Sequence, residues 1–117
     1  MIHPLEGPSL RITAYVGLED TYDERPMYQA LMDQARKQGC AGATVLRGIT
    51  GFGPSSRGEA KHALRMSTDE PILVQVVDEP NRIAALGEVW SSMVNSGLIT
   101  VENTSVVFYG SEMDNEK

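Results

Sequence analysis

The residue types best suited to binding a ligand are concentrated in one stretch of the chain, between Arg47 and Arg65. Its first part carries Gly48, Gly51 and Gly53. Glycine adopts backbone conformations closed to other residues and lets a ligand approach the peptide groups. Because exposed backbone N–H groups beside cationic side chains can hold phosphate or carboxylate groups, this stretch predicts an anion-binding site.

The same stretch is basic, although the protein as a whole is acidic. It holds one acid, Glu59, against four basic residues, whereas the chain of 117 residues has a formal net charge of −6. The basic residues are Arg47, Arg57, Lys61 and Arg65. Nucleic acids and acidic membrane surfaces require broad cationic faces, so we expect neither as a partner and predict a small anionic ligand at a local site. A mobile connector without a ligand is the alternative that the composition leaves open.

Signatures of catalysis and of metal binding are not found in the sequence. There is no Walker loop and no dinucleotide-binding fingerprint. The two histidines, His3 and His62, have no second His, Cys or paired carboxylate at metal-ligand spacing. Ser55 and Ser56 lie near His62, yet no triad or strand–turn–helix elbow surrounds them. We therefore expect no metal site, no catalytic residues and a protein that is not an enzyme.

The cellular setting is predicted from cysteine usage and hydropathy. The single cysteine, Cys40, cannot form an internal disulfide, so nothing requires an oxidising compartment. The first residues lack the charged and apolar regions of a signal peptide, and no apolar segment approaches membrane-spanning length. We expect a cytoplasmic protein without membrane insertion.

Four strands and two helices are predicted around the basic stretch. Apolar and polar residues alternate over residues 9–17, which is typical of a half-buried strand. Further strands are predicted at 43–49, 71–78 and 99–109 from their Val, Ile and Thr content. Helical spacing of apolar residues predicts helices over 26–38 and 80–95, each with a proline at its start and a glycine just beyond its end.

The resulting order, βαββαβ, predicts a single α+β domain spanning 1–117, with its core at about 9–109, a flexible loop at about 50–70 and an acidic tail at 110–117. Right-handed crossovers favour a ferredoxin-like two-layer sandwich, with both helices on one face of an antiparallel sheet. The other face would carry Arg11, Thr13 and Tyr15, which suits solvent or a subunit contact.

The blocks GATVLRGITGFG (42–53), LRMSTDEPI (64–72) and VVD (76–78) resemble the uncharacterised PII-like family known as domain of unknown function 190. The resemblance covers residues 9–108. This family is similar to the PII nitrogen-regulatory superfamily, whose ferredoxin-like subunits form homotrimers with a long T-loop between the second and third strands. The resemblance thus implies a PII-like fold and a role in signal transduction.

The resemblance also implies a ligand and a partner. Intersubunit clefts would bind an adenine nucleotide (ATP, ADP, AMP or a cyclic nucleotide), and the T-loop would engage a regulated protein such as a transporter. The residues expected to contact the ligand are Arg47, Gly48, Gly51, Phe52 and Gly53 at the T-loop base, and Lys61, His62 and Arg65 on the returning arm. The alternatives are a ligand-free trimeric interaction module and, with less support, a metal-tolerance-type or enzymatic relative.

Overall fold

The computed structural model describes residues 5–53 and 70–111. The elements in chain order are β1 (Gly7–Gly17), β2 (Thr21–Tyr22), β3 (Arg25–Pro26), α1 (Met27–Lys37), β4 (Thr44–Arg47), β5 (Pro71–Asp78), α3 (Pro80–Met93) and β6 (Leu98–Val106). Each of the predicted long strands and helices is present, with ends that differ from the predicted ones by at most a few residues.

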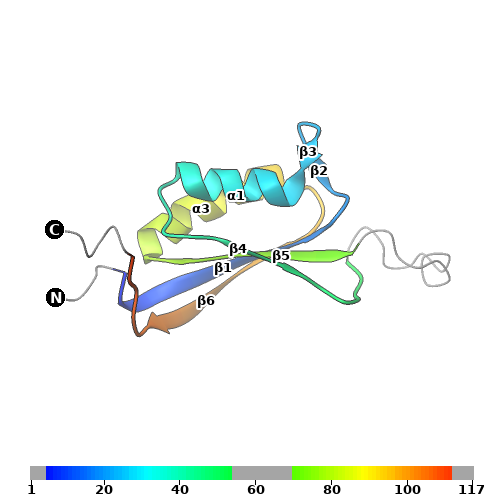
Figure 1. The fold of residues 1–117 in the computed structure, drawn as a ribbon. Helices are drawn as coiled ribbons and strands as arrows, with labels where there is room; N and C mark the ends of the chain where they lie inside the picture. The colour runs from blue at the N-terminus through cyan, green and yellow to red at the C-terminus, as the bar shows by residue number, and fades with distance from the viewer. Residues whose placement is uncertain (1–4, 54–69, 112–117) are drawn as a thin grey trace.

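The main sheet has the strand order β4-β5-β1-β6, and every neighbouring pair is antiparallel. Both helices lie on one face of this sheet (Figure 1). The two central strands are the first and third of the four in chain order, which is the split βαβ arrangement of ferredoxin-like folds. The predicted α+β two-layer sandwich is therefore confirmed.

The core forms between the helices and the sheet face that they cover. The register pairs Ile12 with Val76 and Ala14 with Val74, so apolar side chains of adjacent strands share that face. At the centre lies Trp90 of α3, whose side chain is 0% exposed and whose Nε1 donates a hydrogen bond to the Leu31 carbonyl at 3.1 Å. This contact joins the two helices directly above the sheet.

The end of α1 is determined by a glycine and by contacts from β5 and α3. Gly39 has φ +83° and its N–H bonds the Arg36 carbonyl at 3.0 Å, which closes the last helical turn. The Arg82 guanidinium donates to the Gly39 carbonyl at 2.6 Å, and the Asp78 carboxylate accepts the Ala41 N–H at 2.8 Å. These bonds anchor the connection from α1 to β4 onto the start of α3.

A short hairpin, β2–β3, was not predicted, because strands of two residues are too short to show periodicity. It projects beside the N-terminal end of α1 (Figure 1). Its tip residues Asp23 and Glu24 have φ +53° and +65°, a left-handed conformation that normally selects Gly or Asn. An ion pair between Arg25 and Asp33 holds the hairpin against the helix. Neither described helix combines the length and the apolar character needed to cross a membrane.

Candidate functional site

A pocket of about 510 Å³ lies at the end of the sheet where the chain leaves β4 and returns to β5. Small-molecule sites in proteins occupy about 300 to 1,000 Å³, so this pocket has the size of a ligand site. Its walls come from four places: the end of β1 and the turn after it, residues 48–53, the start of β5, and the turn that leads into β6.

Two glycines allow the pocket walls to pack closely. A Cβ atom at Gly48 would lie 2.7 Å from Cγ of Pro71, and the Gly48 N–H bonds the Pro71 carbonyl at 2.7 Å. A Cβ atom at Gly97 would lie 2.6 Å from the carbonyl oxygen of Tyr15. Such distances are shorter than van der Waals contact, so the walls reach this geometry because these positions have no side chain.

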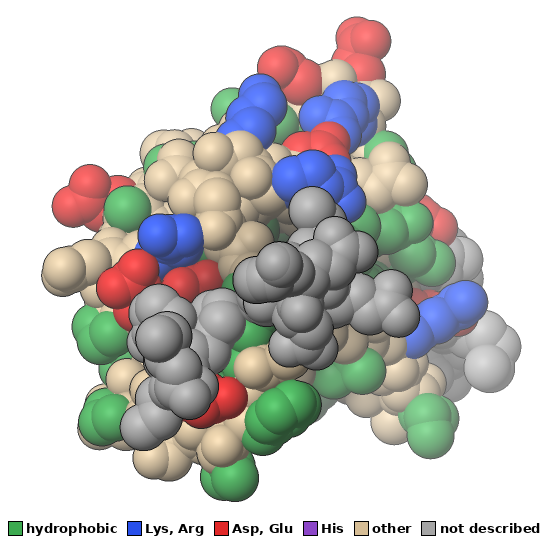
Figure 2. All heavy atoms as spheres, turned by 60° about the vertical axis from the view of Figure 1, so that its left-hand side comes forward, with side chains coloured by type: hydrophobic (Ala, Val, Ile, Leu, Met, Phe, Trp, Pro, Cys, Tyr) green, Lys and Arg blue, Asp and Glu red, His purple; other side chains and the backbone are tan. Residues whose placement is uncertain are grey.

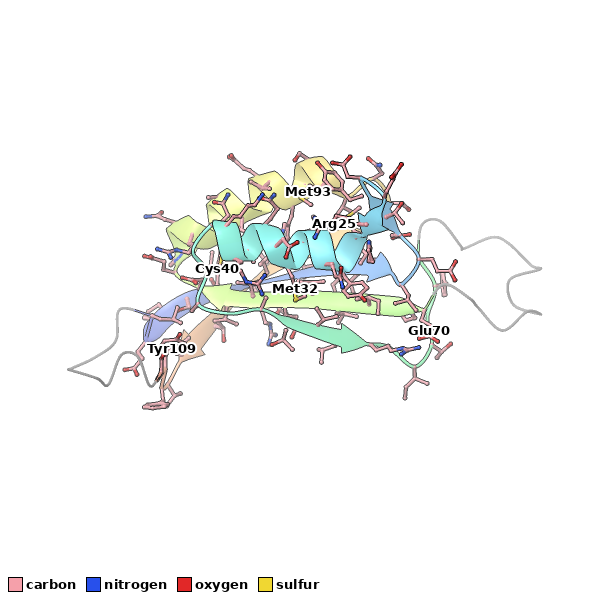
Figure 3. The ribbon with its side chains drawn as sticks, turned by 45° about the horizontal axis from the view of Figure 1, so that its top comes forward. Arg25, Met32, Cys40, Glu70, Met93 and Tyr109 are labelled. Atoms are coloured by element: carbon pink, nitrogen blue, oxygen red, sulfur yellow. The ribbon has the colours of Figure 1, made fainter. Side chains whose placement is uncertain are left out.

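An ion pair links the end of β4 to the start of β5 beside the pocket. Nε of Arg47 lies 2.5 Å from Oε1 of Glu70, so the last residue of β4 is linked to the residue that precedes β5. The hydrogen bond from Arg47 lowers the pKa of the Glu70 carboxyl, and Glu70 raises the pKa of Arg47 in turn. The Glu70 carbonyl also accepts the Leu18 N–H at 2.7 Å. Figure 3 shows Glu70 at this end of the sheet.

The structure brings together most of the glycine-rich residues predicted for the site. Gly48, Gly51, Phe52 and Gly53 all line the pocket. Arg47 is not among the lining residues; its β-register partner is Ile72, a core residue, and its guanidinium bonds Glu70. The predicted residues Lys61, His62 and Arg65 lie outside the described part of the chain.

Sequence reasoning missed the residues that complete the pocket from other segments. Tyr15 pairs with Leu73 of β5 and with Leu98 of β6, and all three line the pocket. The alternation in β1 placed Tyr15 on the helix-free face, but strand register is needed to bring its two partners beside it. Asp20 also lines the pocket, and its only sequence signal was its position in a turn.

The walls are mainly apolar and aromatic, with a single charged side chain among the described lining residues, Asp20. Its Oδ2 accepts the Gly17 N–H at 2.9 Å, and its carbonyl accepts the Met27 N–H at 2.8 Å. These bonds hold the carboxylate in a defined position beside the pocket. In residues 5–53 and 70–111, no three His, Cys, Asp or Glu side chains are close enough together to hold a metal ion.

A comparison with protein families identifies the chain. The model of the DUF190 family, described as "Uncharacterized ACR, COG1993", matches residues 9–106. The chain belongs to the DUF190 family. The match extends from within β1 to the last residue of β6 and so includes every wall of the pocket.

Two relatives are similar to the chain over most of its length. A UPF0166 protein of Aquifex aeolicus is 29% identical over 90 residues, which cover 77% of this chain and 85% of the relative. UPF0166 protein MJ1524 of Methanocaldococcus jannaschii is 32% identical over 94 residues, which cover 79% of this chain and 85% of the relative.

In this DUF190 chain, the helix-free face of the sheet carries an apolar row beside the pocket. The row crosses all four strands, because Leu46 pairs with Leu73, which pairs with Tyr15, which pairs with Leu98. Tyr15 is 39% exposed, Leu46 45% and Leu98 54%. In Figure 2, in which the end of the sheet opposite the pocket comes forward, hydrophobic side chains are scattered along the lower side of the molecule. The predicted assignment of Arg11, Thr13 and Tyr15 to one face is confirmed by the register.

Proposed function

We propose that this protein is a cytoplasmic PII-like regulator that forms a homotrimer, binds a small anionic ligand in the clefts between subunits, and engages a partner protein through its T-loop. The ligand proposed is an adenine nucleotide. The observation that supports this most directly is the pocket at the base of the long connection, lined by Gly48, Gly51, Phe52 and Gly53. A ligand bound there contacts both arms of the T-loop base, so its binding would alter the conformation of the loop.

The apolar row on the helix-free face supports a trimer. Tyr15, Leu46, Leu73 and Leu98 form a continuous strip, and exposed strips of this kind are found at subunit contacts. Because Tyr15, Leu73 and Leu98 belong both to this row and to the pocket wall, a neighbouring subunit packed on the row would also cover one side of the pocket.

The anionic group of the ligand is proposed to lie toward Arg47. This residue flanks the pocket-lining Gly48, and it is already paired with Glu70. A phosphate group would have to compete with Glu70 for the guanidinium. Arg47 therefore has two alternative ion-pair partners, Glu70 and the phosphate group. Replacing Arg47 with Ala is expected to weaken nucleotide binding about tenfold, as for loss of one charge-assisted hydrogen bond. Unchanged affinity would exclude Arg47 from the site.

The central experiment is to identify the ligand. Purified protein is denatured and the released small molecules are identified; calorimetry then measures binding of ATP, ADP, AMP and cyclic nucleotides. A Gly51→Leu variant, which adds a side chain within the pocket wall, is expected to lose binding. A matched Gly42→Leu variant, at an exposed glycine with open space around it, is expected to retain it. If the wild-type protein releases no ligand and binds none of these nucleotides, the sensing role is refuted.

Light scattering tests the assembly. The expected mass is about three times the chain mass of 12.8 kDa, and a stable single subunit would remove the proposed intersubunit clefts. Chromatography of protein incubated with nucleotide is expected to recover the nucleotide unchanged, and its conversion would indicate an enzyme instead. A partner that is captured equally well after complete removal of small molecules would favour the ligand-free interaction module.

A further inference from the structure

Aromatic and apolar side chains line the pocket from two separate segments. Tyr15 of β1 has Leu73 and Leu98 beside it on the neighbouring strands, and these three side chains form one apolar wall. Phe52 lines the same pocket from the connection that follows β4. Aromatic side chains pack favourably against a second ring in offset-stacked or edge-to-face geometry. The lining is therefore suited to a planar ring.

Phe52 is an aromatic residue with little packing of its own. It is 80% exposed, whereas Tyr15, on the apolar wall, is 39% exposed. Exposure of a phenyl ring to water is unfavourable, so a ligand that covers this ring gains free energy in proportion to the apolar area that it buries. The ring of Phe52 is thus accessible to a ligand and contributes little to the packing of the chain itself.

The cation assigned to the phosphate group lies outside this lining. Arg47 is the last residue of β4 and is paired with Glu70, whereas the next residue, Gly48, lines the pocket. A phosphate group placed against an apolar wall loses its hydration, which costs free energy unless a cation or N–H groups replace the water. The ring and the phosphate group of a nucleotide therefore have different favourable places at this end of the sheet.

We propose that the pocket binds the base of the nucleotide and that Phe52 stacks on one face of this ring. The wall formed by Tyr15, Leu73 and Leu98 contacts the base from another side, and the phosphate group lies toward Arg47. The class of ligand is an uncharged, planar heteroaromatic ring, which carries most of the affinity. This inference rests on the proposed function and adds the orientation of the ligand and the residue that recognises its ring.

The first test compares three probes by calorimetry on the wild-type protein. They are AMP, adenosine, which lacks the phosphate group, and ribose 5-phosphate, which lacks the base. Adenosine is expected to bind within about tenfold of AMP, since it loses only the contact with Arg47. Ribose 5-phosphate is expected to bind at least about tenfold more weakly than adenosine, because stacking of a base on an aromatic side chain contributes that much to affinity.

The second test replaces the stacking residue. Phe52→Ala is expected to weaken the binding of AMP and of adenosine by the same factor, about tenfold, and to leave the binding of ribose 5-phosphate unchanged. Phe52→Trp keeps a flat aromatic ring, so its Kd for adenosine is expected to stay within about threefold of the wild-type value. The new indole is expected to be quenched by the bound base, against a constant signal from the buried Trp90.

Two matched variants control for the loss of an exposed apolar side chain. Phe108, the second phenylalanine of the chain, is 78% exposed and lies beyond the end of β6 that is far from the pocket. Ile49 is 99% exposed on the same connection as Phe52 and is not among the described lining residues. Phe108→Ala and Ile49→Ala are both expected to leave the Kd for adenosine unchanged. A urea midpoint of Phe52→Ala equal to that of the wild type is expected, because the ring that it removes is exposed.

The outcomes distinguish the inference from the function on which it rests. If the wild-type protein binds ribose 5-phosphate as tightly as AMP, the pocket does not take the base, and this result does not depend on how any variant folds. If folded Phe52→Ala binds adenosine as tightly as the wild type does, the role of Phe52 is refuted while nucleotide binding stands. If the wild-type protein binds neither adenosine nor any adenine nucleotide, the proposed function and this inference are refuted together.

Discussion

Two glycine-to-alanine substitutions are expected to change stability in opposite directions. Gly87 lies within α3, where a Cβ atom would lie 3.6 Å from Cδ1 of Ile12, an ordinary van der Waals contact. Alanine is favoured over glycine in a helix interior by about 0.8 to 1 kcal/mol. Gly87→Ala should therefore raise the free energy of unfolding by about 1 kcal/mol.

Gly97 has a different environment at the turn before β6. A Cβ atom there would lie 2.6 Å from the carbonyl oxygen of Tyr15 and 3.1 Å from Cγ1 of Val94. The first of these contacts is with backbone in the central strand, which cannot move without disturbing its hydrogen bonds to β5 and β6. Overpacking of this kind costs about 1 to 3 kcal/mol. The lower conformational entropy of the unfolded alanine chain offsets about 0.4 to 1 kcal/mol of that.

Urea unfolding at one fixed protein concentration measures both effects, because association would make the apparent stability depend on concentration. The single tryptophan, Trp90, is fully buried and reports unfolding by fluorescence. We expect the midpoint for Gly87→Ala to lie above that of the wild type and the midpoint for Gly97→Ala to lie below it. A Gly97→Ala midpoint above that of the wild type would show that the turn does not pack against β1 as described.

Three further predictions concern the core, the hairpin and the thiol. Trp90→Phe should lower the free energy of unfolding by about 2 to 3 kcal/mol, because it removes the hydrogen bond to Leu31 and leaves a cavity; a urea midpoint equal to that of the wild type would contradict this. In the same assay, Glu24→Gly should raise the free energy of unfolding by about 0.5 to 1 kcal/mol, because glycine adopts the left-handed conformation of this position without steric strain. Destabilisation of this variant would contradict the turn geometry. Burial, followed by the Asp78 charge, raises the pKa of the Cys40 thiol, so alkylation by iodoacetamide at pH 8 should be slower than for free cysteine. Since the folded pKa exceeds the unfolded one, the contribution of this thiol to stability is present at neutral pH and is lost as pH rises through the thiol pKa values.

Much of the secondary structure was predictable because hydrophobic periodicity is a local property of the chain. The alternation in β1 and the apolar run of β5 identified both central strands, and Gly39 marked the end of α1. The β2–β3 hairpin was missed, because its strands have two residues each and its Asp-Glu tip lacks the glycine of a common hairpin turn. That hairpin forms where Arg25 meets Asp33 of α1, a contact that no local pattern reveals.

The candidate site was predictable only in part. Glycine content identified the wall made by residues 48–53, since a run of glycines is visible in the sequence itself. The ion-pair partner of the Arg47 side chain could not be predicted from the sequence, because Glu70 lies at the other end of the long connection between β4 and β5. Its pairing with that acid, outside the pocket lining, is a product of strand register.

The sequence by itself determined the type and order of the long elements, the single basic and glycine-rich connection, and the face of β1 on which Tyr15 lies. Only the tertiary structure decided that Tyr15, Leu73 and Leu98 form one wall and that Asp20, from the turn after β1, joins the described lining of the pocket. The physical reason is that periodicity and turn preferences act between residues close in the chain. A pocket depends on register and packing between segments far apart, which are determined only when the whole sheet forms.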